Sequence, residues 1–271
     1  MTVFDAILLG LLQGLTEFLP ISSSGHLELG KVVLNDLLGH EVEQGLTFPI
    51  VVHFATVCST ITVFWKDIIG LTSGTFAPIL SGKPQWNDAS RFAFFIIISM
   101  LPVILVYFLW ADQVEELFVG KTMLVGFMLL VTALILWSTT WVRSSDRPLN
   151  VWRALLIGVA QAVTVLPGIS RSGSTIGAGL LLGIDKVQAT RFAFLMVLLP
   201  IIGATFLEVR EHGMLIIEES GTAYLAGFIA AFVSGYVACR WMLNIVRKGK
   251  LAYFAIYCAV IGAAAIIYAA R

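Results

Sequence analysis

The sequence predicts an all-α polytopic membrane protein with six spanning helices and two re-entrant helical hairpins in inverted orientation. Three observations lead to this prediction. Of the 271 residues, 58% are hydrophobic and only 13% are charged, whereas a soluble domain carries about 25% charged residues. Six stretches are apolar over nearly the thickness of a membrane. A short polar motif occurs twice, about 150 residues apart, each time in an apolar stretch broken by proline and glycine.

Six spanning helices are predicted where the apolar stretches approach the roughly 20 residues needed to cross a bilayer. They cover residues 46–65, 91–110, 122–142, 189–207, 222–242 and 251–270.

Four shorter apolar segments remain, and each is too short to span comfortably: 4–18, 26–38, 151–166 and 174–183. They lie in pairs around the two motif copies, so we interpret them as re-entrant hairpins over 4–38 and 151–183. Irregular backbone at membrane depth is tolerated only where protein or a watery cavity surrounds it. We therefore expect a single membrane domain over 1–271, made of an N-terminal half, 1–142, and a C-terminal half, 151–271.

The basic residues predict the orientation. If both hairpins return to the side they entered, 12 lysines and arginines fall on one side and 4 on the other, with Arg171 set aside at a hairpin tip. Cytoplasmic loops carry the excess of Lys and Arg, so both termini are expected outside. Three spans separate the hairpins, so they enter from opposite faces and their tips can meet near the midplane, as in transporters with inverted repeats. The larger set is Lys66, Lys83, Arg91, Arg143, Arg147, Arg153, Lys186, Arg191, Arg240, Arg247, Lys248 and Lys250.

Glu17, in the first motif copy, is the only carboxylate deep in a predicted membrane segment. Ionisable residues inside a membrane are functional by default, so we expect Glu17 to be a catalytic base or a metal ligand rather than a structural glutamate. Gln13 lies four residues earlier, on the same helical face. It is expected either to hold Glu17, water or a cation, or to make a polar contact between helices.

The run Ser22-Ser23-Ser24-Gly25-His26 places three hydroxyls and an imidazole within five residues. A hydroxyl beside a histidine can be an activated nucleophile, and His26 can itself attack or act as a general acid. Capping of a following helix accounts for at least one of the serines. His53, inside a predicted span, is interpreted as a core histidine rather than a member of the site, while His40 and His212 fall in predicted loops.

The second copy, Ser170-Arg171-Ser172-Gly173-Ser174-Thr175, precedes a helix-like run. Hydroxyls, a glycine that permits a tight turn and a helix N-terminus together favour an anion site. The planar guanidinium of Arg171 matches phosphate bidentately. The alternative is a structural pair between Arg171 and Glu17, which would leave so many hydroxyls unexplained.

One carboxylate, one histidine, one arginine and many hydroxyls suit phosphoryl transfer, in which catalysis is positioning plus stabilisation of charge. A divalent cation held by Glu17 and phosphate oxygens fits this set, since Mg²⁺ often binds through one or two carboxylates plus substrate phosphates. No cluster of His and Cys ligands indicates zinc. The formal net charge of +0 gives no indication of nucleic-acid binding.

At these residues the chain resembles the undecaprenyl-diphosphate phosphatases, the bacitracin-resistance family. The first match is the (Glu/Gln)-x-x-x-Glu motif, here Gln13 and Glu17, running into Phe-Leu-Pro-Ile-Ser-Ser-Ser-Gly-His26. The second is Pro167-Gly-x-Ser170-Arg-Ser-Gly-x-Thr175. Both motifs are long and specific. Gln13 stands where some members carry Glu, which leaves a single intramembrane carboxylate and weakens any mechanism that needs two acidic groups.

The resemblance implies removal of the terminal phosphate of undecaprenyl diphosphate at the outer face of the bacterial inner membrane, which recycles a lipid carrier for peptidoglycan. It implies dependence on a divalent cation, Mg²⁺ or Ca²⁺, and interlocked hairpins. By position, the functional residues would be Glu17, Ser23, His26, Ser170, Arg171 and Thr175. We expect Ser170, Arg171, Ser172, Gly173 and Thr175 to grip the diphosphate, Glu17 and Gln13 to hold the cation, and either Ser23, with His26 as base, or His26 itself to attack phosphorus.

Three other classes of protein are alternatives. A transporter or flippase of a polyprenyl phosphate is the main alternative, because inverted hairpins that meet at the membrane midplane are typical of transporters. A type-2 phosphatidic-acid phosphatase would need a histidine where Gly177 stands, five residues after the Ser170-Arg171 pair. A purely structural membrane protein would leave Glu17, His26 and Arg171 unexplained. A homodimer stays open, because the GxxxG-like spacings are too weak to argue one.

Overall fold

The computed structural model describes residues 1–38, 47–82, 85–115, 121–142, 146–203, 205–207, 210 and 221–270. Within these residues all regular structure is helical. The helices are α1 (Val3–Phe18), α2 (Ser23–Leu38), α3 (Thr47–Val63), α4 (Trp65–Leu80), α5 (Asp88–Glu115), α6 (Thr122–Ser138), η1 (Thr139–Trp141), α7 (Val151–Val163), α8 (Arg171–Leu181), α9 (Lys186–Met196), α11 (Gly221–Arg247) and α12 (Ala252–Ala269). Of the residues considered above, His40, His212, Lys83 and Arg143 lie outside the described part.

The helices define a polytopic membrane protein. Among the described residues, five are long and apolar enough to cross a bilayer: Asp88–Trp110, Thr122–Trp141, Lys186–Leu207, Gly221–Arg247 and Ala252–Ala269. These coincide with five of the six predicted spans. The remaining one, predicted over 46–65, is α3, a helix of 17 residues that is followed after one residue by α4, and the two are bent by 76°. They make a sixth crossing only if the bent pair counts as one.

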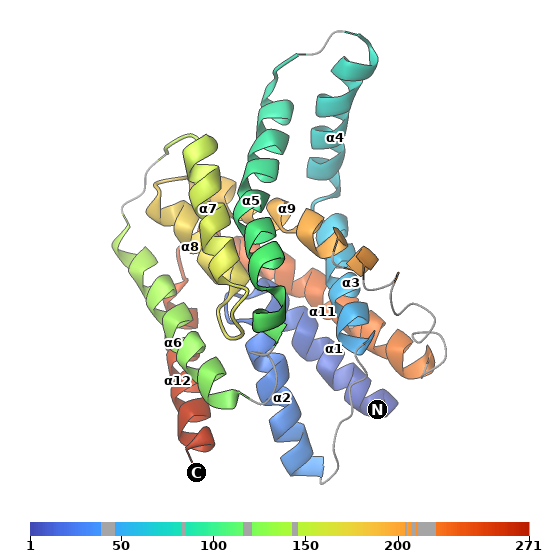
Figure 1. The fold of residues 1–271 in the computed structure, drawn as a ribbon, viewed down its shortest axis with the longest axis vertical. Coiled ribbons are helices and arrows are strands. Elements are labelled where there is room, and N and C mark those ends of the chain that lie inside the picture. The colour runs from blue at the N-terminus through green and yellow to red at the C-terminus, as the bar shows by residue number, and fades with distance from the viewer. Residues whose placement is uncertain are drawn as a thin grey trace.

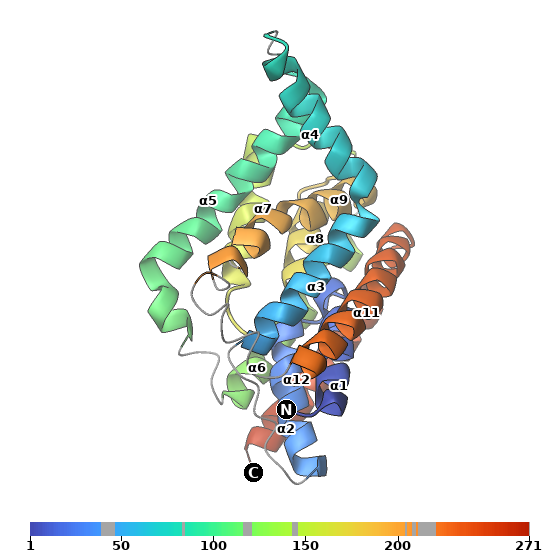
Figure 2. The ribbon, with the colours of Figure 1, turned by 90° about the vertical axis from the view of Figure 1, so that its right-hand side faces the viewer.

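Two helix–turn–helix hairpins stand at the predicted positions. The segment 4–38 forms α1 and α2, and the segment 151–183 forms α7 and α8. The hairpins run in opposite directions: α1 and α2 approach the centre from the lower end of the molecule, α7 and α8 from the upper end, and their turns meet in between (Figure 1). The side view shows the same opposition (Figure 2). Residues about 150 positions apart in sequence are thereby brought together.

The two turns use different residues to reverse the chain. In the first, Ser22 has a φ of 72°, in the left-handed region that L-residues rarely adopt. In the second, Gly168 has a φ of 98° and takes the left-handed position without a Cβ. A non-glycine residue held in this region marks a place where the surrounding structure overrides local preference, and such places cluster at functional sites.

The two motif copies also pack alike. α1 lies along α11, and α7 lies along α5. A Cβ added to Gly10 would overlap the carbonyl oxygen of Gly227, and one added to Gly158, the equivalent glycine, would overlap the carbonyl oxygen of Ser99. Small residues let membrane helices approach this closely, which gives their backbones van der Waals contact. The repeat is therefore one of helix packing as well as of polar residues.

Gly158→Ala is expected to lower stability by about 1–3 kcal/mol, the usual range for overpacking a filled interface. The new methyl group would push α7 away from the Ser99 backbone and displace the turn that carries the second motif. Thermal unfolding of the purified protein in detergent measures the effect. Gly70→Ala on α4 is the matched control, because a Cβ there meets no atom of a neighbouring described residue within 4 Å. Equal transition temperatures for the two variants would contradict the packing argument.

Candidate functional site

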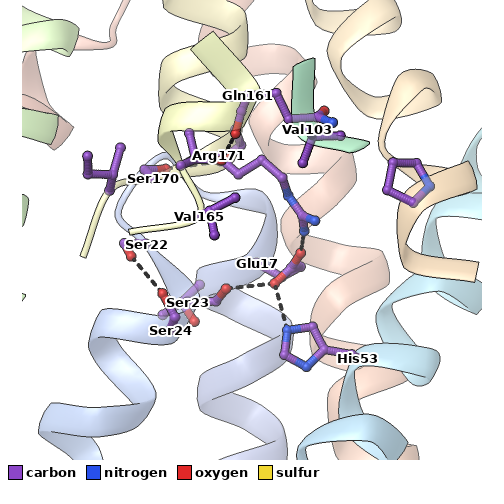
Figure 3. Close-up of a pocket in the computed structure, with 15 residues that line it drawn as sticks. Glu17, Ser22, Ser23, Ser24, His53, Val103, Gln161, Val165, Ser170 and Arg171 are labelled. Atoms are coloured by element: carbon purple, nitrogen blue, oxygen red, sulfur yellow. Dashed lines mark hydrogen bonds and ion pairs between the residues drawn. The ribbon is translucent and has the colours of Figure 1, made fainter. Parts of the chain in front are cut away.

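A cavity of about 460 Å³ lies where the two hairpin turns meet. Its lining comes from both motif copies, from the helices α3 and α5, and from Pro200 in the segment that follows α9. The lining residues are Thr16, Glu17, Ser22, Ser23, Ser24, His53, Val103, Gln161, Thr164, Val165, Ile169, Ser170, Arg171, Ser172 and Pro200. Figure 3 shows that the hydroxyls of the first turn and the guanidinium of the second face the same space. The predicted meeting of the two motifs is therefore present in the structure.

Glu17 is the centre of the polar network in this cavity. Its side chain is buried, and its Oε2 accepts hydrogen bonds from Gln13 Nε2 at 2.9 Å and from Ser23 Oγ at 2.7 Å. Its other oxygen, Oε1, accepts from Arg171 Nη2 in an ion pair between the two hairpins. The expected pairing of Gln13 with Glu17 on one helical face is present. The Arg171–Glu17 pair, considered as the structural alternative, is also present.

Two helix N-termini converge on the same space. α2 begins at Ser23 and α8 begins at Arg171. Each is capped by the preceding serine: Ser22 Oγ accepts from Gly25 N at 3.3 Å, and Ser170 Oγ accepts from Gly173 N at 3.1 Å. Free backbone N–H groups and the positive end of the helix dipole favour an anion at such a terminus. Two of them beside one guanidinium make a site for a group with several negative charges.

The residues predicted to bind phosphate do not all face the cavity. Ser170, Arg171 and Ser172 line it. Ser172 Oγ also donates to the Leu19 carbonyl at 3.1 Å, which ties the second turn to the first. Gly173 and Thr175 lie behind this lining. Thr175 Oγ1 donates to the Arg171 carbonyl at 2.8 Å within α8 and lines a small adjoining cavity of about 20 Å³. Their predicted contact with phosphate stays a prediction.

His26 lies on the other side of the first turn. Its Nδ1 is 2.8 Å from the Ser22 carbonyl, and its Nε2 is 2.9 Å from the Tyr257 hydroxyl, with the two rings stacked at 5.5 Å. The ring lines a second cavity of about 790 Å³ that α1, α11 and α12 enclose. The expected hydrogen bond between Ser23 and His26 is not formed here, because Ser23 donates to Glu17 instead. Although the two residues are only three positions apart, Ser23 lines the first cavity and His26 lines the second.

His53 takes the place beside Glu17. Instead of lying within the core, as we interpreted it, the ring lines the cavity, with Nε2 at 3.9 Å from Glu17 Oε2 (Figure 3). The signal that points to it is its ionisable side chain inside a spanning segment. Gln161 is a second residue that was not assigned to the site. It is the counterpart of Gln13 in the second motif copy, and its buried Oε1 has no hydrogen-bond partner within the part of the chain that the structure describes.

The side chains in the cavity supply only some of the ligands that a hard divalent cation needs. Among the described residues, no group of three His, Cys, Asp or Glu side chains gathers at one point. Glu17 provides one carboxylate, and the buried Oε1 of Gln13 has no hydrogen-bond partner in the described ranges. Such a set suits a cation that keeps its remaining positions for phosphate oxygens and water.

A carboxylate, an arginine, serines and two helix N-termini enclosed by spanning helices define a membrane-embedded protein that handles a phosphorylated ligand. The chain belongs to the bacitracin resistance protein BacA family, whose model matches residues 6–264. It is 50% identical to the undecaprenyl-diphosphatase of Christiangramia forsetii over 99% of both chains. It is 46% identical to that of Bacteroides thetaiotaomicron, over 98% of this chain and 99% of the relative. The identity to that of Methanosphaera stadtmanae is 37%, over 98% of this chain and 97% of the relative.

Proposed function

We propose that this protein hydrolyses undecaprenyl diphosphate to undecaprenyl phosphate and inorganic phosphate. Relatives that bear the name undecaprenyl-diphosphatase match it over nearly their whole length. The observation that carries the proposal is the hydrogen bond of 2.7 Å from Ser23 Oγ to Glu17, at the N-terminus of α2 and next to Arg171. A hydroxyl that donates to a carboxylate beside an anion site is a nucleophile with its base in place.

In the first step, Arg171 and the two helix N-termini bind the diphosphate in the cavity. Glu17 takes the proton of Ser23, whose oxygen attacks the terminal phosphorus. The bond from that phosphorus to the bridging oxygen breaks, and undecaprenyl phosphate leaves with the bridging oxygen. In phosphoryl transfer, most of the rate enhancement comes from positive groups that stabilise the negative charge on the phosphate oxygens in the transition state.

In the second step, water adds to the phosphorus of phospho-Ser23. The bond between the serine oxygen and phosphorus breaks, and Glu17 returns its proton to Ser23. Inorganic phosphate is released with both protons of the water. The geometry favours Ser23 over His26 as the nucleophile, because the imidazole of His26 lies in the other cavity with both nitrogens hydrogen-bonded.

A divalent cation, Mg²⁺ or Ca²⁺, belongs to this proposal. Glu17 and Gln13 would hold it, together with oxygens of the diphosphate. When bound, the cation neutralises charge on the phosphates.

We further propose that the hairpins α1–α2 and α7–α8 are re-entrant and inverted within a six-span domain of two halves, 1–142 and 151–271. Their opposite directions support this (Figure 1). The 12-to-4 distribution of basic residues supports a bacterial inner-membrane orientation with both termini and the mouth of the cavity outside. In a variant lacking its native cysteines, Lys250→Cys should react with an impermeant maleimide only after cells are permeabilised. Labelling of intact cells would reverse the orientation.

Ser23→Ala is expected to lower phosphate release from undecaprenyl diphosphate about 10³-fold or more, because loss of a nucleophile removes the covalent route. The measurement uses purified protein in detergent with Mg²⁺ or Ca²⁺, and mass spectrometry of acid-quenched wild type should find phosphate on Ser23. Ser24→Ala is the matched control, since among the described residues the Ser24 hydroxyl is hydrogen-bonded to Ser22, at 3.4 Å, and not to Glu17. Full activity of Ser23→Ala would contradict the mechanism. No release by folded wild type would favour transport of the lipid.

A further inference from the structure

His53 is held in one tautomer by its own helix. Its Nδ1 is 2.8 Å from the carbonyl oxygen of Pro49. A carbonyl oxygen only accepts hydrogen bonds, so Nδ1 carries a proton, and Nε2 of the neutral ring presents a lone pair. A histidine fixed through one nitrogen by a backbone carbonyl, with the other nitrogen free, is the arrangement that metal-binding histidines use.

The free nitrogen faces another acceptor. His53 Nε2 lies 3.9 Å from Glu17 Oε2, and the histidine side chain is 35% exposed toward the cavity. Two lone-pair donors that face each other call for a positive group between them. Ligands that are each about 2.1 Å from one cation stand about 3 Å apart when adjacent and about 4 Å apart when opposite. The observed separation falls within this range.

Gln13 adds a second, independent indication. Its side chain has no exposed surface, and its Oε1 has no hydrogen-bond partner among the described residues. Its Nε2 donates to the same Oε2 of Glu17 that faces His53. The oxygen and nitrogen of an amide exchange places by rotation, so the amide can turn its oxygen toward a cation at Glu17. An unpaired buried carbonyl oxygen is otherwise a destabilising feature.

We propose that His53 Nε2 and Glu17 Oε2 together bind a first-row divalent transition cation, with Gln13 Oε1 and phosphate oxygens completing the shell. This inference rests on the divalent cation of the proposed function and names a transition cation, in place of Mg²⁺ or Ca²⁺, as the preferred occupant of the same site. A nitrogen ligand favours transition cations over Ca²⁺ and Mg²⁺, which prefer oxygen alone. Arg171 pairs with the other oxygen, Oε1. Oε2 accepts from Gln13 and from Ser23, and turning the Gln13 amide frees one of these two positions for the cation.

The test uses Mn²⁺ as the probe on the purified full chain, prepared without a histidine tag. Pulsed electron paramagnetic resonance of bound Mn²⁺ should show modulation from a directly coordinated imidazole nitrogen. His53→Gln should abolish that modulation and weaken Mn²⁺ binding at least about tenfold. His26→Gln is the matched control and should retain the modulation, because His26 lies in the other cavity. His53→Asn serves as a second variant if His53→Gln unfolds at a lower temperature than wild type.

Nitrogen modulation that is absent from wild type, or that persists in both His53 variants, would overturn the inference. The same preparations are assayed for phosphate release with Mg²⁺, which separates the two proposals. Release without imidazole coordination would remove the role of His53 as a ligand and leave the phosphatase intact. Imidazole coordination without release would retain the cation site and remove the phosphatase.

Discussion

Glu17→Gln is expected to reduce kcat for phosphate release by about 10³-fold, within the range that general-base catalysis contributes. The substitution keeps the shape of the side chain but removes the charge that accepts the proton of Ser23 at 2.7 Å. It also removes the anion that pairs with Arg171. KM is expected to change less than kcat, because the diphosphate is bound mainly by Arg171 and the helix N-termini. Steady-state kinetics in detergent measures both constants.

The control for this prediction is Glu28→Gln. Glu28 lies on α2, pairs with Lys31 at 3.3 Å and is outside the cavity, so its loss should leave kcat within about twofold, as expected for a surface pair worth at most about 1 kcal/mol. If Glu17→Gln retained most of the wild-type kcat, Glu17 would be neither the base for Ser23 nor a ligand of the cation. Dependence on the cation should also weaken in Glu17→Gln, and an unchanged cation affinity would remove the ligand role alone.

Arg171→Ala is expected to lower kcat/KM by about 10³-fold, the lower end of the effect of an arginine that stabilises a transferring phosphoryl group. The loss should appear in both KM and kcat, because the guanidinium binds the diphosphate and neutralises charge as the bridging bond breaks. Arg171→Lys should recover only part of the activity, since an ammonium group does not provide a planar bidentate fork. Arg191→Ala, which breaks the half-buried Arg191–Asp67 pair of 2.7 Å outside the cavity, is the control.

A double variant separates binding of phosphate from a structural role of the Arg171–Glu17 pair. Arg171→Ala leaves the Glu17 carboxylate buried without its partner, which is destabilising. Adding Glu17→Gln removes that charge, so Arg171→Ala/Glu17→Gln should unfold at a higher temperature than Arg171→Ala while remaining inactive. Recovery of activity together with stability would mean that Arg171 serves the structure alone.

Local sequence predicted the two hairpins well because their signals are local. Segments too short to span, a proline or glycine at the turn and a capping serine before each inner helix all act within a few residues. The start of α8 at Arg171 follows from the Ser170 cap. The bend of 76° between α3 and α4 was not predicted, because the apolar run continues across it and the break at Phe64 carries no proline or glycine.

The duplicated motif also predicted which residues would meet. Glu17 and Arg171 are 154 positions apart, and they form an ion pair because the two turns face each other. A buried charge requires a partner of opposite charge. The first motif copy provides the carboxylate of Glu17, and the second provides the guanidinium of Arg171. The equivalence of Gly10 and Gly158 extends the repeat to the packing of α1 and α7.

The sequence by itself determined that this is a membrane protein, that polar chemistry lies inside it, and that the two turns near Glu17 and Arg171 meet. These conclusions follow from the length of apolar segments and from the unfavourable energy of an unpaired buried charge, which depend on residue type alone. Only the tertiary structure decided that His53, rather than His26, stands beside Glu17. Helical spacing determines which side chains share a face of one helix. Which other helix packs against that face depends on how α1, α3 and α12 are arranged, and this arrangement rests on contacts between residues far apart in the chain.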